Sequence, residues 1–263
     1  MRKKFYCLLA LSAAAALAQK DQPATPNPPD DAMQKKIITD AMAKALAYEK
    51  ELPDFVCNQV TRRNEDPKGT NQWRTLETVN EQLTFLHGKE EYRTVAVNGK
   101  KVNAESNRPG WLMPSSEFTK FLVWTLSPKS QAEISWSSWD ALRGHRVHVL
   151  GFRVAKEHSE YVVQRGKGAA ITTGFFGVIN VDADTGAILK LGIIPTDIPA
   201  AYPVAGISLE LHWEYAKIGD HYYLLPFKAD LHSKEGKALS WNEVEYRDYH
   251  KPGAGSATAK APE

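Results

Sequence analysis

The sequence has little cysteine, little net charge and no long hydrophobic run. Only two of its 263 residues are cysteine, Cys7 and Cys57, and Cys7 falls within a predicted signal sequence, so no pair is left to form an internal disulfide. Removing residues 1–18 takes three positive charges from the formal net charge of +2 and leaves about −1. This balance predicts no nucleic-acid partner, and no apolar run reaches the ~20 residues that span a bilayer.

Motifs that hold a metal, a cofactor or a catalytic nucleophile are also absent from the sequence. It has no His-Glu-x-x-His pair, no cysteine–histidine cluster with zinc spacing, no Walker phosphate loop and no Gly-x-Ser-x-Gly elbow. His145 and His148 lie three apart in a predicted strand, so their side chains would point to opposite faces. Cys57 is expected to be a half-buried strand thiol, because no histidine partner is indicated for a nucleophile. We therefore expect no metal, no cofactor and no enzyme activity.

Two groups of acidic residues offer alternatives to this expectation. Asp182, Asp184 and Gly186 resemble the start of a calcium loop, but the third acidic ligand and the terminal glutamate are missing, so we interpret them as a turn. Glu243 and Glu245 share one face of the last predicted strand, which permits an acid–base pair of the kind found in hydrolases. A solvated strand face with a cross-strand ion pair is the more common use of that pattern.

Segments at both ends lie outside a single predicted domain, residues 32–250. Residues 1–18 are predicted to be a signal peptide, since a charged start precedes a short apolar core and the small-x-small sequence of residues 16–18. Residues 19–31 are predicted to form a proline-rich linker, and residues 251–263 a disordered tail. The sequence thus predicts an exported protein, periplasmic or extracellular, that is soluble after cleavage.

Two helices are predicted. The first has an N-cap at Asp30 or Asp31 and runs to about Glu51, because Pro53 stops it. Its apolar residues form one narrow stripe at helical spacing: Met33, Ile37, Ala41, Ala45 and Leu46. The second helix is short and apolar, follows a serine-rich cap at residues 115–117, and carries Phe118, Phe121, Leu122 and Trp124.

The remaining pattern is that of strands and hairpins. Residues 174–191 give the clearest hairpin, because aspartate and glycine at 182–186 separate two β-branched, apolar runs. Asn98-Gly99 predicts a type I′ turn, and residues 207–215 alternate apolar and polar side chains, which indicates one buried and one solvated face. The predicted fold class is mainly β (α+β): a large curved antiparallel meander, or half-barrel, of about 10–11 strands, with the 174–191 hairpin near its centre.

Several blocks resemble an uncharacterised family of secreted acidobacterial proteins. They include the segments 52–57, 61–63, 130–136, 142–145, 181–189, 197–199, 223–226 and 242–246. A wider resemblance is to the periplasmic lipoprotein-carrier superfamily and its outer-membrane lipoprotein-sorting relatives, which carry a similar hairpin with the pattern Val-Asp-x-x-Thr-Gly-x-Ile-Leu. That resemblance implies a half-barrel of about eleven strands closed by helices over an apolar cavity, and non-catalytic binding of acyl chains or lipidated partners.

A hydrophobic binding site is therefore expected on the concave face of the sheet, because an empty apolar hollow forfeits packing contacts. The residues expected to line or close it are Phe121, Trp124, Leu189, Leu191, Ile207, Leu209, Leu211 and Trp213. The expected ligand is a hydrophobic small molecule such as a lipid, or a lipidated envelope protein. Two alternatives stay open: an envelope interaction module in which the same residues form a solid core against the first helix, and a hydrolase of envelope glycans or peptides.

Overall fold

The computed structural model describes residues 26–102, 113, 116–165 and 168–253. Two α-helices accompany thirteen strands within these residues. The helices are α1 (Asp31–Glu51) and α2 (Ser116–Leu126), and short 3₁₀ turns occupy Pro128–Ser130 and Lys156–His158. The strands are β1 (Phe55–Asp66), β2 (Arg74–Leu86), β3 (Lys89–Val97), β4 (Lys100–Lys101), β5 (Glu133–Leu142), β6 (His145–Val154), β7 (Val162–Val163), β8 (Ile171–Thr172), β9 (Phe175–Asp182), β10 (Ile188–Pro195), β11 (Gly206–Ile218), β12 (His221–Glu235) and β13 (Ala238–His250).

Eleven of the strands form one curved antiparallel sheet, as the predicted fold class requires. Its order is β4-β3-β2-β1-β13-β12-β11-β10-β9-β6-β5, which departs from a simple meander in two places. The N-terminal strand β1 pairs with the C-terminal strand β13, and β9 pairs with β6 because β7 and β8 leave the sheet to form a separate ribbon. The β9–β10 hairpin therefore lies toward one side of the sheet and not at its centre, and the strand predicted near residues 160–164 does not join the sheet.

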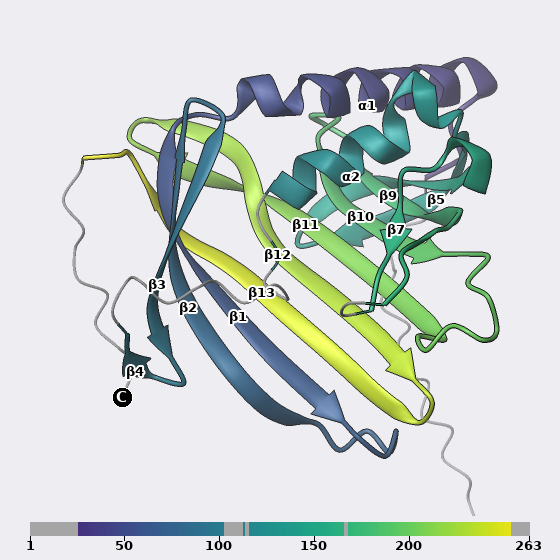
Figure 1. Cartoon of the computed structure of the whole chain (residues 1–263). Coiled ribbons are helices and arrows are strands. Elements are labelled where there is room, and N and C mark those ends of the chain that lie inside the picture. The colour runs from purple at the N-terminus through teal and green to yellow at the C-terminus, as the bar shows by residue number, and fades with distance from the viewer. Residues whose placement is uncertain (1–25, 103–112, 114–115, 166–167, 254–263) are drawn as a thin grey trace, which may run out of the picture.

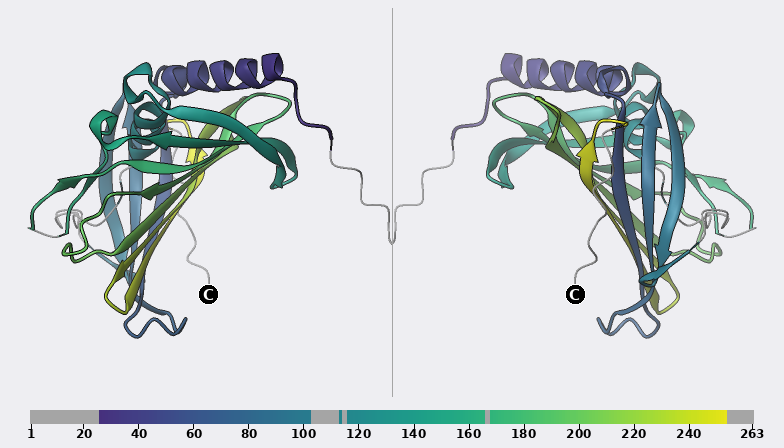
Figure 2. Two further views of the ribbon diagram at one scale, coloured as in Figure 1. Left: turned by 90° about the vertical axis from the view of Figure 1, so that its right-hand side faces the viewer. Right: turned by 90° about the vertical axis from the view of Figure 1, so that its left-hand side faces the viewer.

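The two helices cover one face of the sheet, called here the inner face. Helix α1 lies across one end of the sheet, α2 lies beneath it, and the long strands β1, β2, β12 and β13 extend beyond both helices (Figure 1). The side views show α1 above the ends of the strands (Figure 2). Most of the inner face near the helices is filled, because α2 buries five side chains against it. The ring of Phe118 lies 5.1 Å from that of Trp213 on β11 and 5.6 Å from that of Tyr246 on β13.

Helix α1 begins as predicted and buries part of the predicted stripe, since Ala41 and Ala45 are buried and Ile37 packs against the core. The side chain of Asp30 accepts a hydrogen bond of 2.8 Å from the backbone N–H of Met33, which caps the first turn. The buried residues are Ala41, Ala45 and Tyr48, whereas Met33 and Leu46 are exposed. Leu46 is exposed because consecutive helical residues lie ~100° apart, so the residue after Ala45 points away from the sheet. Helix α1 thus packs against α2 and the sheet through alanines, Tyr48 and partly buried residues such as Ile37.

The predicted turns at residues 98–99 and 182–186 are confirmed. Asn98 and Gly99 both have positive φ, at 50° and 73°, which is the type I′ geometry of a two-residue hairpin. At the second turn, Asp182 Oδ1 accepts hydrogen bonds from the backbone N–H groups of Asp184 and Thr185 and from the Thr185 hydroxyl. These bonds fix the connection between β9 and β10 directly below helix α1.

Candidate functional site

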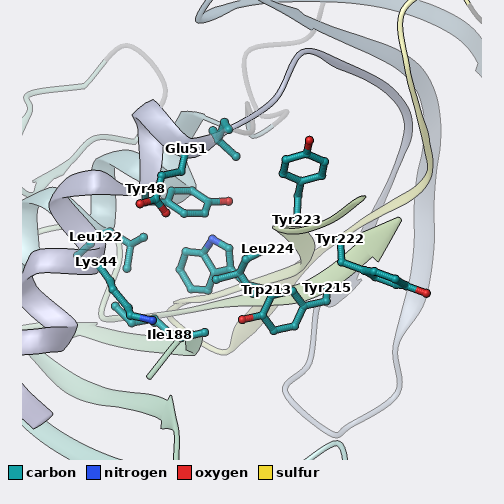
Figure 3. A pocket seen from close by; sticks show the side chains of 13 residues that line it. Lys44, Tyr48, Glu51, Leu122, Ile188, Trp213, Tyr215, Tyr222, Tyr223 and Leu224 are labelled. Atoms are coloured by element: carbon teal, nitrogen blue, oxygen red, sulfur yellow. The ribbon is translucent and has the colours of Figure 1, made fainter. Parts of the chain in front are cut away.

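A cavity of about 300 Å³ lies between helix α1 and the adjacent ends of β10, β11 and β12. Its apolar and aromatic walls come from both helices and from the sheet (Figure 3). Thirteen residues line it: Lys44, Ala45, Tyr48, Glu51, Leu52, Leu122, Ala187, Ile188, Trp213, Tyr215, Tyr222, Tyr223 and Leu224. Its volume is at the lower end of the range for ligand pockets, ~300–1,000 Å³.

Helix α1 forms one wall because residues at helical spacing point toward the strands. Ala45, Tyr48 and Leu52 lie three and four residues apart and therefore share one face. The ammonium group of Lys44 donates a hydrogen bond of 2.5 Å to the backbone carbonyl oxygen of Thr185, in the β9–β10 turn. This bond connects the helix to the sheet at the rim of the cavity.

The turn that receives Lys44 is held by a buried carboxylate, that of Asp182. Burial alone would raise the pKa of this carboxyl, but hydrogen bonds from the backbone and hydroxyl of Thr185, from His145 and from the backbone of Asp184 outweigh it and lower the pKa. The His145 Nδ1 atom lies 2.6 Å from Asp182 Oδ2. Asp182 and Asp184, which resemble the start of a calcium loop, thus act as turn residues. Among the described residues, no group of three or more histidine, cysteine, aspartate or glutamate side chains could hold a metal ion.

Trp213 forms the floor of the cavity and is fully buried. Its indole contacts the ring of Tyr48 edge-on at 6.2 Å, and the ring of Phe118 at 5.1 Å. These T-shaped contacts join α1 and α2 to β11, and they fix the orientation of the indole.

Two buried polar atoms of the cavity wall lie next to each other and interact with each other (Figure 3). They are the Tyr48 hydroxyl and the indole nitrogen of Trp213, and both are buried. Figure 3 shows the indole nitrogen on the side of its ring that faces Tyr48. Burial raises the pKa of Tyr48, an effect that the adjacent Trp213 N–H partly opposes, so this hydroxyl is neutral.

The structure distributes the eight predicted site residues over several places. Of these, Trp213 alone lines the cavity, and it also belongs to the main hydrophobic core, as do Phe121, Leu191, Leu209 and Leu211. Their role in binding stays a prediction, although their burial in the core matches the solid-core alternative.

The other three predicted site residues, Trp124, Leu189 and Ile207, lie elsewhere. Trp124 is partly buried next to Phe121. Leu189 packs in a separate small cluster and not in the core under the helices. A register shift in β10 between Ile188 and Lys190 turns Leu189 and Leu191 to different faces of the sheet. Ile207 lines a second, shallower cavity at the opposite end of β11.

Most residues of the cavity wall were not predicted from the sequence. Tyr48 and Leu52 continue the spacing of Ala41 and Ala45, so a strict helical count could have found them. The tyrosines and leucine at 222–224 carry no such signal, because their place beside α1 depends on the long-range position of the helix.

Glu243 and Glu245, whose spacing also permits an acid–base pair, form cross-strand ion pairs instead. This is the solvated, ion-paired strand face that the sequence favoured. Glu243 lies 2.9 Å from Lys228 and 3.3 Å from Arg62, and Glu245 lies 3.0 Å from Arg62 and 2.5 Å from Arg247. These contacts leave both side chains on a charged ladder of β1, β12 and β13.

Cys57 is fully buried, more deeply than expected, and burial raises the pKa of its thiol. A thiol of this kind is not the thiolate that acts as a nucleophile.

Some predictions concern residues outside the described ranges. They are the signal peptide at 1–18, residues 19–25 of the linker and residues 254–263 of the tail. Among the described residues, no helix is both long and apolar enough to cross a membrane.

No family model and no curated protein sequence matches the chain. Solved structures of other proteins resemble its fold distantly. A DUF1329 family protein from Desulfovibrio piger is 10% identical, with a TM-score of 0.38 over 84% of this chain and 94% of that one. A LolA superfamily protein from Nitrosomonas europaea is 10% identical, with a TM-score of 0.36 over 83% and 93%. An outer membrane lipoprotein-sorting protein domain from Vibrio parahaemolyticus is 12% identical, with a TM-score of 0.38 over 87% and 96%.

Likenesses of this size transfer no ligand and no residue role to this chain. The resemblance to a secreted acidobacterial family stays a prediction.

Proposed function

We propose that this protein is a non-catalytic binding protein that holds one hydrophobic chain, such as an acyl group, in the cavity between α1 and strands β10–β12. The observation that supports the proposal is the cavity itself, which stays open where α2 fills most of the neighbouring inner face. Its floor and inner wall are apolar, with Leu122, Ile188 and Trp213, while Lys44 and Glu51 lie at its rim. Apolar walls with a few polar groups are typical of small-molecule sites.

The size of the cavity limits the ligand. A volume of about 300 Å³ equals that of about ten water molecules in the liquid, so it accommodates one chain segment of about ten non-hydrogen atoms. Burying ten methylene groups contributes about 8 kcal/mol. The loss of translational and rotational freedom offsets several kcal/mol of this gain. We therefore expect micromolar or weaker affinity, suited to a ligand that is released again.

The place of action is part of the same proposal. Residues 1–18 have the pattern of a secretory signal, which supports export to the periplasm or the extracellular space. A lipid, or the acyl chain of a lipidated envelope protein, is a ligand that such a location would supply.

The second candidate function is an envelope interaction module without a ligand. It is supported by the core under the helices, which already contains five of the eight residues predicted to line a hollow. This alternative treats the cavity as a packing defect, and it predicts that no hydrophobic probe binds there.

A cavity-filling variant distinguishes the two candidates. Ala45 lines the cavity on α1, so Ala45→Leu would occupy part of it, whereas Ala43→Leu makes the same change on the exposed side of the same helix. The probe is N-phenyl-1-naphthylamine, whose fluorescence rises on entering an apolar site. The proposal predicts saturable binding to the wild type and to Ala43→Leu, and at least tenfold weaker binding to Ala45→Leu. Equal binding to all three proteins, or none to the wild type, would contradict it.

A further inference from the structure

The second, shallower cavity has a volume of about 300 Å³ and lies on the outer face of the sheet, the face turned away from the two helices. Ser208 on β11 lines it and alternates with the buried Leu209, so the Ser208 side chain points to the outer face. On that face the strand register sets Ser208 beside His232 of β12, and Gly206 beside Lys234. Because Gly206 has no side chain, this square of four residues has one open corner, which forms part of the cavity floor.

Trp73 forms one wall of this cavity, and its ring is exposed. The ring lies edge-on to that of His232 at 6.4 Å and to that of Trp241 at 6.0 Å. His232 and Trp241 pair across β12 and β13 with nearly parallel rings, 5.4 Å apart, and the Trp241 indole donates a hydrogen bond of 2.8 Å to Asp230 Oδ1. The three rings thus form a fixed corner on a polar strand face. Exposed aromatic side chains with polar neighbours are typical of binding sites.

The loop that carries Trp73 is held in place by its own residues. Asp66 is buried at the end of β1, and its carboxylate accepts hydrogen bonds from the backbone N–H groups of Lys68 and Gly69. Gly69 has a positive φ of 66°, and a Cβ atom there would lie 2.6 Å from the backbone carbonyl oxygen of Lys237 in the β12–β13 turn. Trp73 is therefore positioned before any ligand binds, which lowers the entropic cost of binding.

The polar groups of the cavity suit a ligand that carries hydroxyl groups. The Ser208 hydroxyl and the His232 imidazole can each donate or accept a hydrogen bond, and the Lys234 ammonium group donates. Within the described part of the chain, no aspartate or glutamate lines the cavity. A pyranose ring has hydroxyl groups around its edge and C–H groups on its faces, which pack against the electron-rich face of an aromatic ring such as that of Trp73.

The size and shape of the cavity fit one sugar ring. Its volume of about 300 Å³ equals that of about ten water molecules in the liquid, which is close to the volume of one pyranose unit. A flat nucleobase stacks best between parallel rings, whereas the ring planes of Trp73 and His232 meet at 79°. A puckered pyranose is thick enough to contact both walls of this corner.

We propose that this cavity binds one pyranose unit of a carbohydrate, with a C–H face of the sugar against Trp73 and its hydroxyl groups bonded to Ser208, His232 and Lys234. The site lies on the opposite face of the sheet from the acyl-chain cavity under α1. The two ligands therefore bind independently, and this site goes beyond the proposed function.

The test is saturation-transfer difference NMR with maltose, cellobiose, lactose and chitobiose, which detects weak binding and shows which sugar protons touch the protein. We expect millimolar binding of at least one of them, with the strongest transfer to the ring C–H protons of one unit. Trp73→Ala should weaken this binding about tenfold, because it removes an aromatic wall. Phe176→Ala removes another exposed aromatic ring, which lines neither cavity, and should bind as the wild type does.

A second variant fills the cavity without removing a contact. A Cβ atom on Gly206 would meet no described atom within 4 Å, so Gly206→Leu places its side chain in the hollow without a clash. Gly151→Leu makes the same change at an equally open glycine of β6, away from the cavity. We expect Gly206→Leu to weaken disaccharide binding at least tenfold with an unchanged urea midpoint, while Gly151→Leu and Ala45→Leu bind as the wild type does.

Three outcomes would overturn the proposal. They are the absence of saturation transfer to every disaccharide, equal binding by the wild type and Gly206→Leu, and tighter binding of adenosine than of any disaccharide. The last result would assign the corner to a flat aromatic ligand. None of the three bears on the acyl-chain cavity, whose test uses a different probe and Ala45→Leu.

Discussion

The guanidinium group of Arg143 donates a hydrogen bond of 2.7 Å to the backbone carbonyl oxygen of Trp213, the floor of the cavity. The same group donates a longer bond, 3.4 Å, to the carbonyl oxygen of Leu189. Both acceptors lie next to register shifts, one between Ile188 and Lys190 and the other between His212 and Trp213. Carbonyl groups at such irregularities lose partners in the strand ladder, and Arg143, at the β5–β6 turn, supplies donors to both.

Replacing Arg143 should therefore destabilise the cavity end of the sheet. Arg143→Lys keeps the charge but loses the planar fork that reaches two carbonyl groups. We expect it to lower the free energy of unfolding by about 1 kcal/mol, since the residue is partly exposed, as measured by urea denaturation. Arg93→Lys, which alters an exposed arginine bonded to Gln82, should have little effect. Equal unfolding midpoints for Arg143→Lys and Arg93→Lys would show that the two carbonyl bonds contribute nothing.

A second prediction concerns ligand size. Leu122→Ala should enlarge the cavity, because Leu122 is a buried wall residue on α2. The loss of packing should cost about 2–5 kcal/mol of stability, and longer esters such as methyl decanoate should gain affinity relative to methyl octanoate. Leu150→Ala removes an equally buried leucine outside the cavity, so it should lower stability without changing the ligand preference. The prediction is wrong if both variants rank the two esters as the wild type does.

A third prediction follows from the carboxylate that holds the β9–β10 turn. The pKa of Asp182 lies below its ordinary value of 3.8, so its ionised form contributes stability at pH above that value. The contribution is lost as pH falls through the folded-state pKa. Asp182→Asn should cost about 1–3 kcal/mol at pH 7, and much less at pH 2.5, in urea unfolding curves. Asp184→Asn, at an exposed position of the same turn, keeps the hydrogen bonds that Asp182 accepts and should change stability little. A constant Asp182→Asn effect at both pH values would refute the assignment.

A fourth prediction concerns Cys57. The thiol is fully buried in β1 and its pKa is raised by burial, so it should not react with Ellman's reagent in the native protein. One equivalent of thiol per mature chain should react after unfolding in guanidinium chloride. Rapid labelling of the native protein at pH 8 would mean that β1 opens locally or that Cys57 is accessible.

Local sequence patterns predicted the elements that local chemistry determines. The Asp30 cap, the Asn98-Gly99 turn and the turn at Asp182 each depend on residues within a few positions of one another. The alternation in β11 correctly placed Leu209, Leu211 and Trp213 on the buried face. These features needed no knowledge of distant contacts.

The cavity could not be predicted in the same way, because its walls meet only through long-range packing. Leu189 left the expected face through a register shift that its own sequence does not signal. The sequence predicted that Ile207 and Trp213 line the same site. The two residues lie far apart along the long strand β11 and line two different cavities. Tyr48 joined the site because α1 lies across the end of the sheet, a position set by α2 and by the bond from Lys44 to Thr185.

The most direct test of the central claim is to locate a bound acyl chain by photo-crosslinking. A methyl ester of a short fatty acid carrying a diazirine on its chain would be bound to the wild-type protein and irradiated, and the labelled residues would be identified by peptide mass spectrometry. We predict labels on residues of the cavity wall, foremost Leu122, Ile188 and Leu224, and loss of the labels in Ala45→Leu. Labels concentrated at Ile207 and Trp73 in the second cavity, or spread without preference over the surface, would contradict it.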